Sequence, residues 1–486
     1  MSIFPVLAAP VLTALCSATL HVEPDGVDSP DRDGLSRETA FRTLAYACEQ
    51  LPPGTAEDRN VIRVGKGNHV CTRPAVVPDH THVFGNGFHG DGSNFSVLVA
   101  SPDWPLRPAP CDGPLDDETI CVIKKGATDV KLFGLMFTSD ESVTEPAKMM
   151  TGGVLMDASS DITIDTCRFR SFRWFGINAL VCRDVEIARC GFKHCSTVKC
   201  RHRLGQVSTR YLKDSAIHHC RFEPDTGYGY KGGGHTNVRF HDNTVEDCYF
   251  AIESPHENER GFEIDHNELH GAISVPKGGP GADPTKDGFD YSVEIHHNVM
   301  TDSYGIEGPR NHLRVHHNYA AIDKPNGRFY ACFGGINEGP VRIDHNVIEN
   351  VDRSLVWVRE GRSAGVTVDH NTVFLADAQG RAGYVLSAWS GEHIDDWTVT
   401  DNIFVAAWSR PRRLMRTERH VPEKINVRGN VCVNILGVPE GNTTGVYPDL
   451  VRGMTEKPWE YYAPRSPLTA GAVRFDETPE AVGPRP

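Results

Sequence analysis

Aromatic residues and long apolar runs are scarce in this sequence. Only 8% of the 486 residues are aromatic, and beyond the amino terminus no stretch is long and apolar enough to span a bilayer. The sequence also has no excess of basic residues. It contains 50 Lys and Arg against 64 Asp and Glu, which gives a formal net charge of −14. This balance argues against a nucleic-acid partner. Glycine, with 46 residues, is abundant, as in proteins built of strands and turns.

The amino terminus carries an apolar run over residues 2–16, and Cys16-Ser17-Ala18 resembles a signal cleavage site. Pro5, Pro10 and the lack of Lys or Arg in this run argue against a signal peptide. We keep residues 1–18 as a possible export signal, which would make the protein secreted or periplasmic.

A short motif recurs from about residue 160 to residue 430. Alternating apolar residues lead to a fixed Cys or Asn, and successive motifs lie 20 to 31 residues apart. The motif ends at Cys167, Cys190, Cys220, Asn243, Asn267, Asn298, Asn318, Asn346, Asn371, Asn402 and Asn430. Alternation at period two predicts strands, and a fixed motif with variable spacing predicts a solenoid of stacked coils.

Stacking places equivalent residues of neighbouring coils about 4.8 Å apart. The Asn side chains should then form a ladder at one turn. The three Cys of the motif would continue this ladder as small buried residues, and we expect them to be free thiols. The 23 His residues include pairs such as His296-His297 and His316-His317 just before the ladder position. Because such pairs recur with the motif, we interpret them as turn residues and assign no metal and no cofactor.

The predicted fold is all-β, a right-handed parallel β-helix of about 11–12 coils. We expect an amphipathic helix to begin near Ser36 and to cap the open end of the solenoid, with one apolar face formed by Phe41, Leu44, Ala45 and Cys48. The predicted parts are an amino-terminal strand and capping helix (residues 1–60), the β-helix (61–435) and a carboxy-terminal tail packed on it (436–486). The sequence leaves the oligomeric state undetermined.

This repeat and the opening segment 24–47 resemble the pectate-lyase-like β-helix superfamily, and the opening is typical of its bacterial carbohydrate-active members. The resemblance implies a polysaccharide or oligosaccharide substrate. It also implies a substrate groove along one sheet, formed by the strands that follow the Asn turn.

Three successive coils align on these strands, at residues 252–256 (IESPH), 273–277 (ISVPK) and 306–310 (IEGPR). In this register His256, Lys277 and Arg310 form one column about 10 Å long. Glu253 and Glu307 form a second column, with Ser274 between them. Stacked cationic groups repel one another, so stability alone does not favour the first column, and we interpret it as functional.

Flanking coils add further groups. Tyr230 and Lys231 should lie level with Ile252 and Glu253. Substrate-binding positions are predicted on these coils at Lys231, Glu253, Glu307, Asn337, Glu338, Trp357, Arg359 and Trp389, the two Trp as platforms for sugar rings. The segments Gly278–Tyr291 and Tyr319–Tyr330 should border the groove as loops.

Such a site suits β-elimination on a uronate, which needs a base, positive charge for the enediolate and an acid for the leaving oxygen. His256 would be the base and Lys277 a base or acid. Arg310 would clamp the carboxylate. Tyr230 or Tyr304 would protonate the leaving oxygen.

The pair of His256 and Lys277 resembles the alginate-lyase and chondroitinase-B family, in which a Lys and an Arg on adjacent coils act. That family's calcium-binding carboxylates are not matched here, where Tyr249 and Ala251 stand. The resemblance is therefore closer to metal-independent poly-mannuronate lyases. Residues 254–257 (SPHE) also resemble the Asp-Pro-His-Asp motif of mannuronan C5-epimerases.

The sequence thus predicts a polysaccharide lyase and leaves three alternatives open. One is a uronate C5-epimerase, which shares the proton abstraction. The second is a glycoside hydrolase that uses two carboxylates, with Glu253 and Glu307 about 10 Å apart and Asp287 and Asp290 as further candidates. The third is a sugar-binding protein without catalysis.

Overall fold

The structure is a computed structural model. It describes residues 17–87, 95–106, 115–140, 148–197, 205–225, 227–254, 259–275, 284–308, 312–322, 327–332, 340–358, 363–375, 383–388, 394–406, 411–415, 425–445, 450–451 and 463–464, together with residues 143, 145 and 324.

The described residues form three long parallel sheets of 15, 15 and 14 strands, which we call A, B and C in the order in which each coil visits them. Sheet A consists of β1 (Thr19–Val22), β2 (Asn60–Val64), β5 (Thr81–Phe84), β8 (Thr128–Phe133), β11 (Ser160–Asp165), β14 (Arg183–Ala188), β17 (Lys213–His218), β20 (Thr236–His241), β23 (Arg260–Asp265), β26 (Val293–His296), β29 (Leu313–His316), β32 (Val341–Asp344), β35 (Ser363–Asp369), β38 (Ile394–Thr400) and β41 (Ile425–Arg428).

Sheet B consists of β3 (Gly67–Cys71), β6 (Ser96–Ala100), β9 (Leu135–Thr138), β12 (Arg168–Arg170), β15 (Gly191–Lys193), β18 (Arg221–Phe222), β21 (Thr244–Val245), β24 (Glu268–His270), β27 (Val299–Thr301), β30 (Tyr319–Ala321), β33 (Val347–Val351), β36 (Thr372–Leu375), β39 (Ile403–Ala406), β42 (Val431–Val433) and β44 (Thr443–Thr444).

Sheet C consists of β4 (Ala75–Val77), β7 (Thr119–Ile123), β10 (Gly152–Asp157), β13 (Phe175–Leu180), β16 (Gly205–Arg210), β19 (Tyr228–Lys231), β22 (Phe250–Glu253), β25 (Ile273–Ser274), β28 (Ile306–Glu307), β31 (Arg328–Cys332), β34 (Ser354–Val358), β37 (Tyr384–Ala388), β40 (Arg412–Met415) and β43 (Ile435–Leu436). The remaining elements are α1 (Leu44–Gln50), η1 (Asp116–Glu118), η3 (Pro284–Asp287) and the antiparallel pair β45 (Leu450–Val451) and β46 (Ala463–Pro464).

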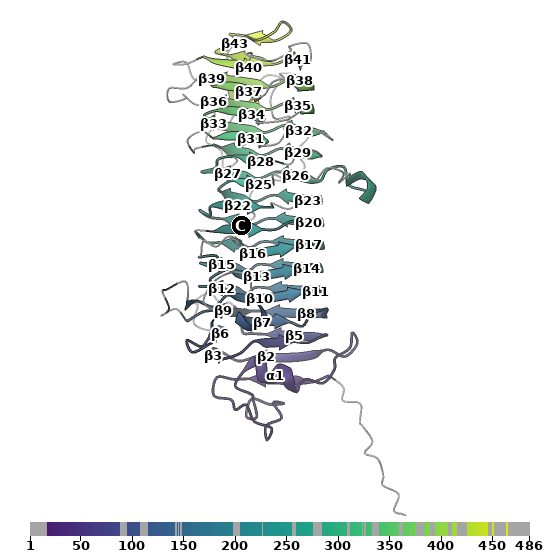
Figure 1. The fold of residues 1–486 in the computed structure, drawn as a ribbon, viewed down its shortest axis with the longest axis vertical. Helices are drawn as coiled ribbons and strands as arrows, with labels where there is room; N and C mark the ends of the chain where they lie inside the picture. Colours follow the sequence, from purple (N-terminus) through teal and green to yellow (C-terminus); the bar gives the residue numbers. More distant parts are fainter. Residues whose placement is uncertain are drawn as a thin grey trace, which may run out of the picture.

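The three sheets stack coil upon coil into one long column (Figure 1). This is the predicted right-handed parallel β-helix. Apolar side chains that point inward from all three sheets form one continuous core. Within it Phe137, Phe169, Phe192 and Phe222 stack on successive strands of sheet B, with ring centroids 4.9 to 5.1 Å apart. Each coil is too short to bury its apolar residues alone, so neighbouring coils supply the cover.

The predicted asparagine ladder is confirmed. Each Asn side chain donates to the amide oxygen of the next rung, in an unbroken series from Asn243 through Asn430 to Asn442. Asn318 is representative, because its amide nitrogen donates to the Ile295 and His316 carbonyls and to the Asn346 side chain at 2.9 to 3.0 Å. From Asn243 onward the ladder therefore joins each coil to the next at one turn.

The cysteines of the motif occupy the same rung as free, buried thiols, as predicted. The Cys220 thiol donates to the carbonyls of His218 and Ile187, the counterparts of the two carbonyls that an Asn rung contacts. Its backbone N–H in turn donates to the Asn243 side chain at 2.9 Å. A thiol is a weak hydrogen-bond donor, so the Cys rungs make the same contacts as the Asn rungs with weaker hydrogen bonds.

The predicted number of coils is too low, because it counts only those that carry the Asn or Cys mark. The first coils lack the mark. For example, Leu135 occupies the rung that pairs with Cys167, as the register of the next residues, Met136 and Arg168, shows. In addition, β43 and β44 extend sheets C and B past the last predicted coil, up to Thr444.

The capping helix exists but begins at Leu44, later than the predicted start near Ser36. The Phe41 N–H donates to the His21 carbonyl, and the Phe41 carbonyl accepts from Glu23, so this residue bridges to β1 and cannot be helical. The Asp28 carboxylate holds the Arg42 and Thr43 N–H groups, and Thr43 caps the helix by accepting from Tyr46. The apolar side of α1 packs into the core at the lower end of the column (Figure 1).

One predicted groove-bordering loop is wrong as stated, because Tyr319–Tyr330 contains β30 and the start of β31. None of the helices in the described part of the chain has the length and apolarity that a bilayer crossing requires.

The ladder makes a strong prediction for stability. Replacement of Asn318 by Ala removes the partners of a buried backbone N–H on Asn298 and of two buried carbonyls, at a cost of about 3 kcal/mol or more. Guanidinium unfolding followed by circular dichroism should show this loss. Asn442→Ala, at the half-exposed end of the ladder, should cost less than about 1 kcal/mol, because water can replace its bonds. Equal losses in the two variants would contradict the ladder's role.

Candidate functional site

A row of polar side chains crosses the outer face of sheet C on four successive strands. Lys231 of β19 pairs with Glu253 of β22, which pairs with Ser274 of β25, and Ser274 pairs with Glu307 of β28. The predicted register of these coils is therefore confirmed. In each of the four strands the neighbouring residue on the amino-terminal side points into the core, so the alternation of the strand presents the row to the outside.

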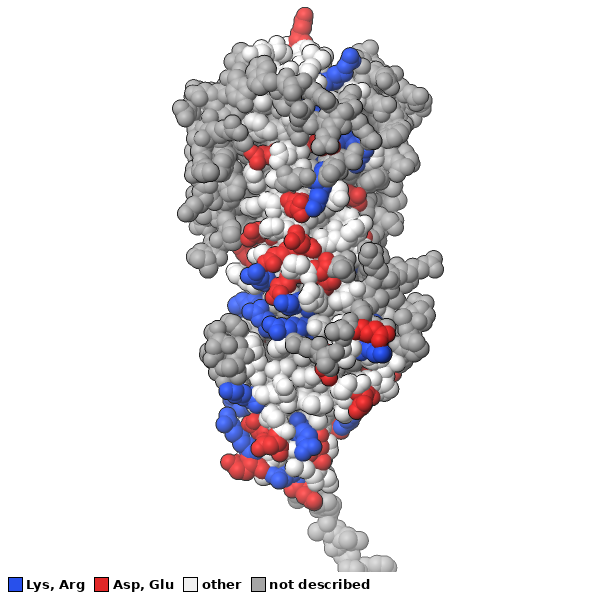
Figure 2. Space-filling model, turned by 90° about the vertical axis from the view of Figure 1, so that its left-hand side faces the viewer, with Lys and Arg blue, Asp and Glu red and all other residues white. Residues whose placement is uncertain are grey.

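The row does not lie on the strand that directly follows the Asn turn, as the sequence analysis supposed. That strand belongs to sheet B, and the aligned residues belong to the next one, in sheet C. Sheet B carries a different surface. Figure 2 shows that face of the column, where basic side chains gather below acidic ones. They pair across the coils, for example Lys193 with Glu223 at 3.1 Å and Arg221 with Glu246 at 2.6 Å.

A hollow of about 220 Å³ opens beside the row. Its larger lining residues are Phe250, Tyr304, Glu307 and Arg328, which come from three different coils. On the coil between Phe250 and Tyr304 only Ala272 lines the hollow. The register places Gly271 of this coil between Phe250 and Tyr304. The hollow thus exists because one coil has no side chain where its two neighbours carry aromatic rings.

The two carboxylates of the row differ in their surroundings. Burial, together with the charge of Glu253, raises the pKa of the Glu307 carboxyl, although Ser274 and Arg328 oppose the shift. Ser274 Oγ donates to Glu307 at 3.0 Å. Glu253 is instead paired with the Lys231 ammonium at 2.9 Å. The site therefore holds one carboxyl that retains a proton more readily than usual and one carboxylate that sits beside a cation.

Arg328 supplies a second positive group. Its guanidinium lies over the Trp357 ring at 4.0 Å, and burial lowers its pKa to about 10, so it stays charged at neutral pH. Its Nε is buried and has no hydrogen-bond partner among the described residues. Trp357 itself is only 5% exposed. The prediction of Trp357 as an open sugar platform therefore needs correction, since Arg328 covers a face of the ring.

Tyr230 is wrongly predicted as a proton donor to the substrate. It pairs with Ile252 and points into the core, where its hydroxyl lies 2.6 Å from Thr209 Oγ1 and 2.8 Å from His235 Nε2. Burial raises its pKa far above the usual value. Alternation explains the error, because Lys231 next to it points outward. Tyr304, the other tyrosine considered for this role, is exposed and lines the hollow.

The whole predicted cationic column and four of the predicted substrate-binding residues lie outside the described residues, and their placement stays a prediction. This holds for His256, Lys277, Arg310, Asn337, Glu338, Arg359 and Trp389. The segments on either side of sheet C are partly described. Residues 284–291 follow β25 in the chain, and residue 322 precedes β31.

Sequence reasoning missed Arg328 and Phe250. The signal was present, because extension of the register Ile252–Ile273–Ile306 by one coil reaches Tyr330. Residues two positions before these core residues then include Phe250, Tyr304 and Arg328, which line the hollow. The prediction instead took Asn337 and Glu338 for the next coil, whereas the register pairs Glu307 with Ala331 of β31.

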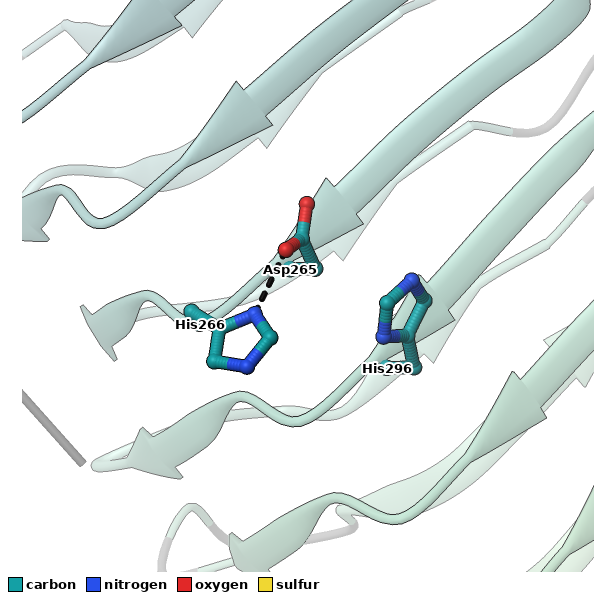
Figure 3. A group of neighbouring side chains, drawn as sticks. All are labelled: Asp265, His266 and His296. Carbon is teal, nitrogen blue, oxygen red and sulfur yellow. Dashed lines mark hydrogen bonds and ion pairs between the residues drawn. The ribbon is translucent and has the colours of Figure 1, made fainter. Parts of the chain in front are cut away.

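Groups of side chains that can hold a metal lie on sheet A, away from this row. One consists of Asp265, His266 and His296, shown in Figure 3, and the other of Glu294, His296 and His316. A wide hollow of about 440 Å³ also opens on sheet A, over β11 to β23.

Comparisons with known proteins support the fold. A family model described as "Right handed beta helix region" matches residues 144–318. The structure is similar to a mutant tailspike protein of E. coli bacteriophage HK620 in complex with a hexasaccharide, with 11% identity, coverage of 82% of this chain and 73% of the tailspike, and a TM-score of 0.51. The fold is a right-handed β-helix.

A second mutant tailspike of the same phage has 11% identity, coverage of 86% of this chain and 74% of that chain, and a TM-score of 0.51. A mutant DFA-IIIase from Arthrobacter chlorophenolicus A6 has 11% identity, coverage of 78% and 91%, and a TM-score of 0.45. The sequence matches no curated protein.

The raised pKa of Glu307 predicts a gain of stability when the charge is removed. The folded protein penalises ionised Glu307, so this penalty is present above the folded-state pKa and vanishes below the unfolded-state pKa of about 4.3. Glu307→Gln should therefore raise the thermal unfolding midpoint at pH 7, with a gain that shrinks towards pH 4.

Glu294→Gln is the matched control. The pKa of Glu294 is lowered, with its bond to His316 and nearby charges outweighing the effect of burial, so its ionised form is favoured in the folded protein. This variant should lower the midpoint at pH 7. If both variants shift the midpoint in the same direction, the assignment of a desolvated acid at Glu307 fails.

Proposed function

We propose that this protein is a glycoside hydrolase that cleaves a polysaccharide or oligosaccharide at the row Lys231–Glu253–Ser274–Glu307. The observation that carries the proposal is the pair of unlike, half-buried carboxyls on the outer face of sheet C. Hydrolysis of a glycosidic bond commonly uses two such groups, one as an acid with a raised pKa and one as an ionised carboxylate.

Glu307 is the proposed general acid. It would donate its proton to the glycosidic oxygen as the bond to the anomeric carbon breaks. Ser274, which donates to the Glu307 carboxyl, would orient it so that its proton faces the substrate. The hollow lined by Phe250, Tyr304 and Arg328 would hold the sugar ring on one side of the bond.

Glu253 is the proposed base, which would take a proton from the attacking water. Glu253 and Glu307 stand two strands apart, with Ser274 between them, so their backbones are separated by about 9 to 10 Å. This separation is near the range in which a water fits between the carboxyl groups, about 6.5–9.5 Å, and favours inversion of configuration. Lys231, paired with Glu253, would position the base.

The fold is compatible with such a substrate, since a tailspike of this fold is bound to a hexasaccharide in its own structure. The charged Arg328 with its free Nε favours a sugar that carries a carboxylate or a hydroxyl at this position. A secreted or periplasmic location would suit a polysaccharide substrate and remains part of the proposal.

β-Elimination at His256, Lys277 and Arg310 is the second candidate. The observation that favours it is the confirmed register of the coils, which is the same register that aligns these three residues. A metal-independent lyase of this kind would act on a uronate, and a C5-epimerase would share its first step.

Four variants decide between these mechanisms. After a panel of neutral and uronate polysaccharides has given an active substrate, Glu307→Gln and Glu253→Gln should each lower kcat by at least about 100-fold if the protein is a hydrolase. His256→Ala and Lys277→Ala should then mainly affect KM. New reducing ends report both reactions, and the ultraviolet absorbance of an unsaturated uronate reports elimination alone.

The reverse order of losses, together with the new absorbance, would replace hydrolysis by elimination. Glu186→Gln, on sheet A, controls for loss of a charge outside the proposed site and should leave kcat unchanged. Full activity in both Glu253→Gln and Glu307→Gln would overturn the proposal.

A further inference from the structure

The histidines before the asparagine ladder fall into two classes that the sequence alone does not separate. His266, His297, His317, His345 and His370 occupy a left-handed turn, with φ between 51° and 55°. Their rings stack in one column at 4.9 to 5.1 Å. His296 and His316 belong instead to β26 and β29, whose alternation points them outward from sheet A. Turn chemistry explains the first class and leaves the second class without a role.

Carboxylates surround this second class. His296 Nε2 donates to Glu263 at 2.8 Å, and His316 Nε2 donates to Glu294 at 2.8 Å. Ligand atoms of Glu294, His296 and His316 all lie within 4.8 Å of one another. The side chains of His296 and His316 are only 12% and 10% exposed, so the strands hold the donors in a fixed, partly dry arrangement.

We propose that Glu294, His296 and His316 form a binding site for a divalent transition metal of the Zn²⁺ class, with Glu263 as the nearest further ligand. Imidazole nitrogens and carboxylate oxygens are the ligands that Zn²⁺ takes in four-coordinate sites, at about 2.0–2.2 Å. The metal would take the place of the Nε2 protons between each His and its Glu.

The turn histidines supply the support that metal-binding imidazoles need. His296 Nδ1 lies 2.7 Å from His297 Nδ1, and His316 Nδ1 lies 2.8 Å from His317 Nδ1. Without metal, the proton of His296 is on Nε2 because a carboxylate only accepts, so His297 Nδ1 donates. With metal on Nε2, His296 carries its proton on Nδ1 and His297 accepts. Each pair holds two protons in both states, and the second imidazole orients the first.

Two arginines lie close enough to compete with a metal for the carboxylates of Glu294 and Glu263. Arg314 lies 3.7 Å from Glu294, and Arg239 lies 3.5 Å from Glu263. Both guanidiniums make their shorter contacts elsewhere, with Asp344 and Asp265 respectively, at 2.5 to 3.1 Å. The two Glu carboxylates therefore remain open to a metal.

The neighbouring group Asp265, His266 and His296 is the poorer site. Figure 3 shows Asp265 bonded to His266, with His296 separate on the next strand. Asp265 is fully buried and already accepts two bonds from Arg239 and one from His266. A metal there would have to break these bonds.

A metal at the proposed site would tie β26 to β29, and through Glu263 also to β23. The coils of these strands continue into β25, β28 and β31 of sheet C, which carry Ser274, Glu307 and Arg328. The site would thus act as a clamp on the coils that hold the hollow, on a face that the proposed hydrolysis does not use.

Co²⁺ titration tests the site on the full-length protein after dialysis against a chelator. One equivalent should bind with the visible absorption of tetrahedral Co²⁺, and Zn²⁺ should displace it. His296→Ala and His316→Ala should each weaken binding at least 100-fold, and His297→Ala about 10- to 100-fold through loss of orientation. His345→Ala and His370→Ala, turn histidines of the same column, should leave affinity unchanged.

Zn²⁺ should also raise the thermal unfolding midpoint of the wild type but not of His316→Ala, since a ligand that binds only the folded state stabilises it. Glu294→Gln, which keeps the shape of the side chain, serves if an alanine variant does not fold, and it too should weaken Co²⁺ binding. Absence of binding at millimolar Co²⁺ and Zn²⁺, or equal affinity in all variants, would overturn the proposal.

Discussion

The in-register stacking of coils at the asparagine turn is the constraint on which the rest of the structure depends. The side-chain amide of each Asn rung pairs with two donors of the preceding rung and with several carbonyl or amide oxygens. A shift of the register by one residue would leave these polar groups unpaired in the core. The ladder runs from Asn243 to Asn442 and lies between sheets A and B. Along these coils, the side chains on the sheets inherit their neighbours from that alignment.

The candidate site shows how a regular scaffold can host an irregular feature. On the outer side of sheet C, Gly271 stands in register between Phe250 and Tyr304, and only Ala272 of its coil lines the hollow. The hollow brings a desolvated carboxyl and a guanidinium to the same place, where Glu307 and Arg328 influence each other's charge. Burial of these two charged groups lowers the stability of the fold locally. The fold tolerates this loss because the ladder and the core stabilise the coils independently of the outer face.

The histidine-rich edge of sheet A illustrates a second use of repetition. A stacked column of imidazoles would be unstable if all were charged. Burial, followed by the charges of neighbouring imidazoles, lowers the pKa of His297 and of His317 to about 3. Neutral imidazole rings can stack on the rings of neighbouring coils, and each ring can both accept and donate a hydrogen bond. The same neutral rings are then available to orient His296 and His316, so a structural repeat can support a binding site without further residues.

The sequence by itself determined the fold, the ladder and the row Lys231–Glu253–Ser274–Glu307. These depend on alternation at period two and on a motif repeated along the chain, and both are local properties of the sequence. It did not determine where α1 begins, because the bridge from Phe41 to β1 overrides the local helical pattern.

Only the tertiary structure decided how the side chains on neighbouring coils share the surface. It placed Arg328 over Trp357, opened the hollow above Ala272 and separated the strand histidines from the turn histidines. These features depend on which side chains are large on three coils at once, and residues 20 or more apart in the chain carry no local signal of that packing. Periodicity predicts that coils stack, whereas the volumes that meet across the stack decide where a ligand can enter.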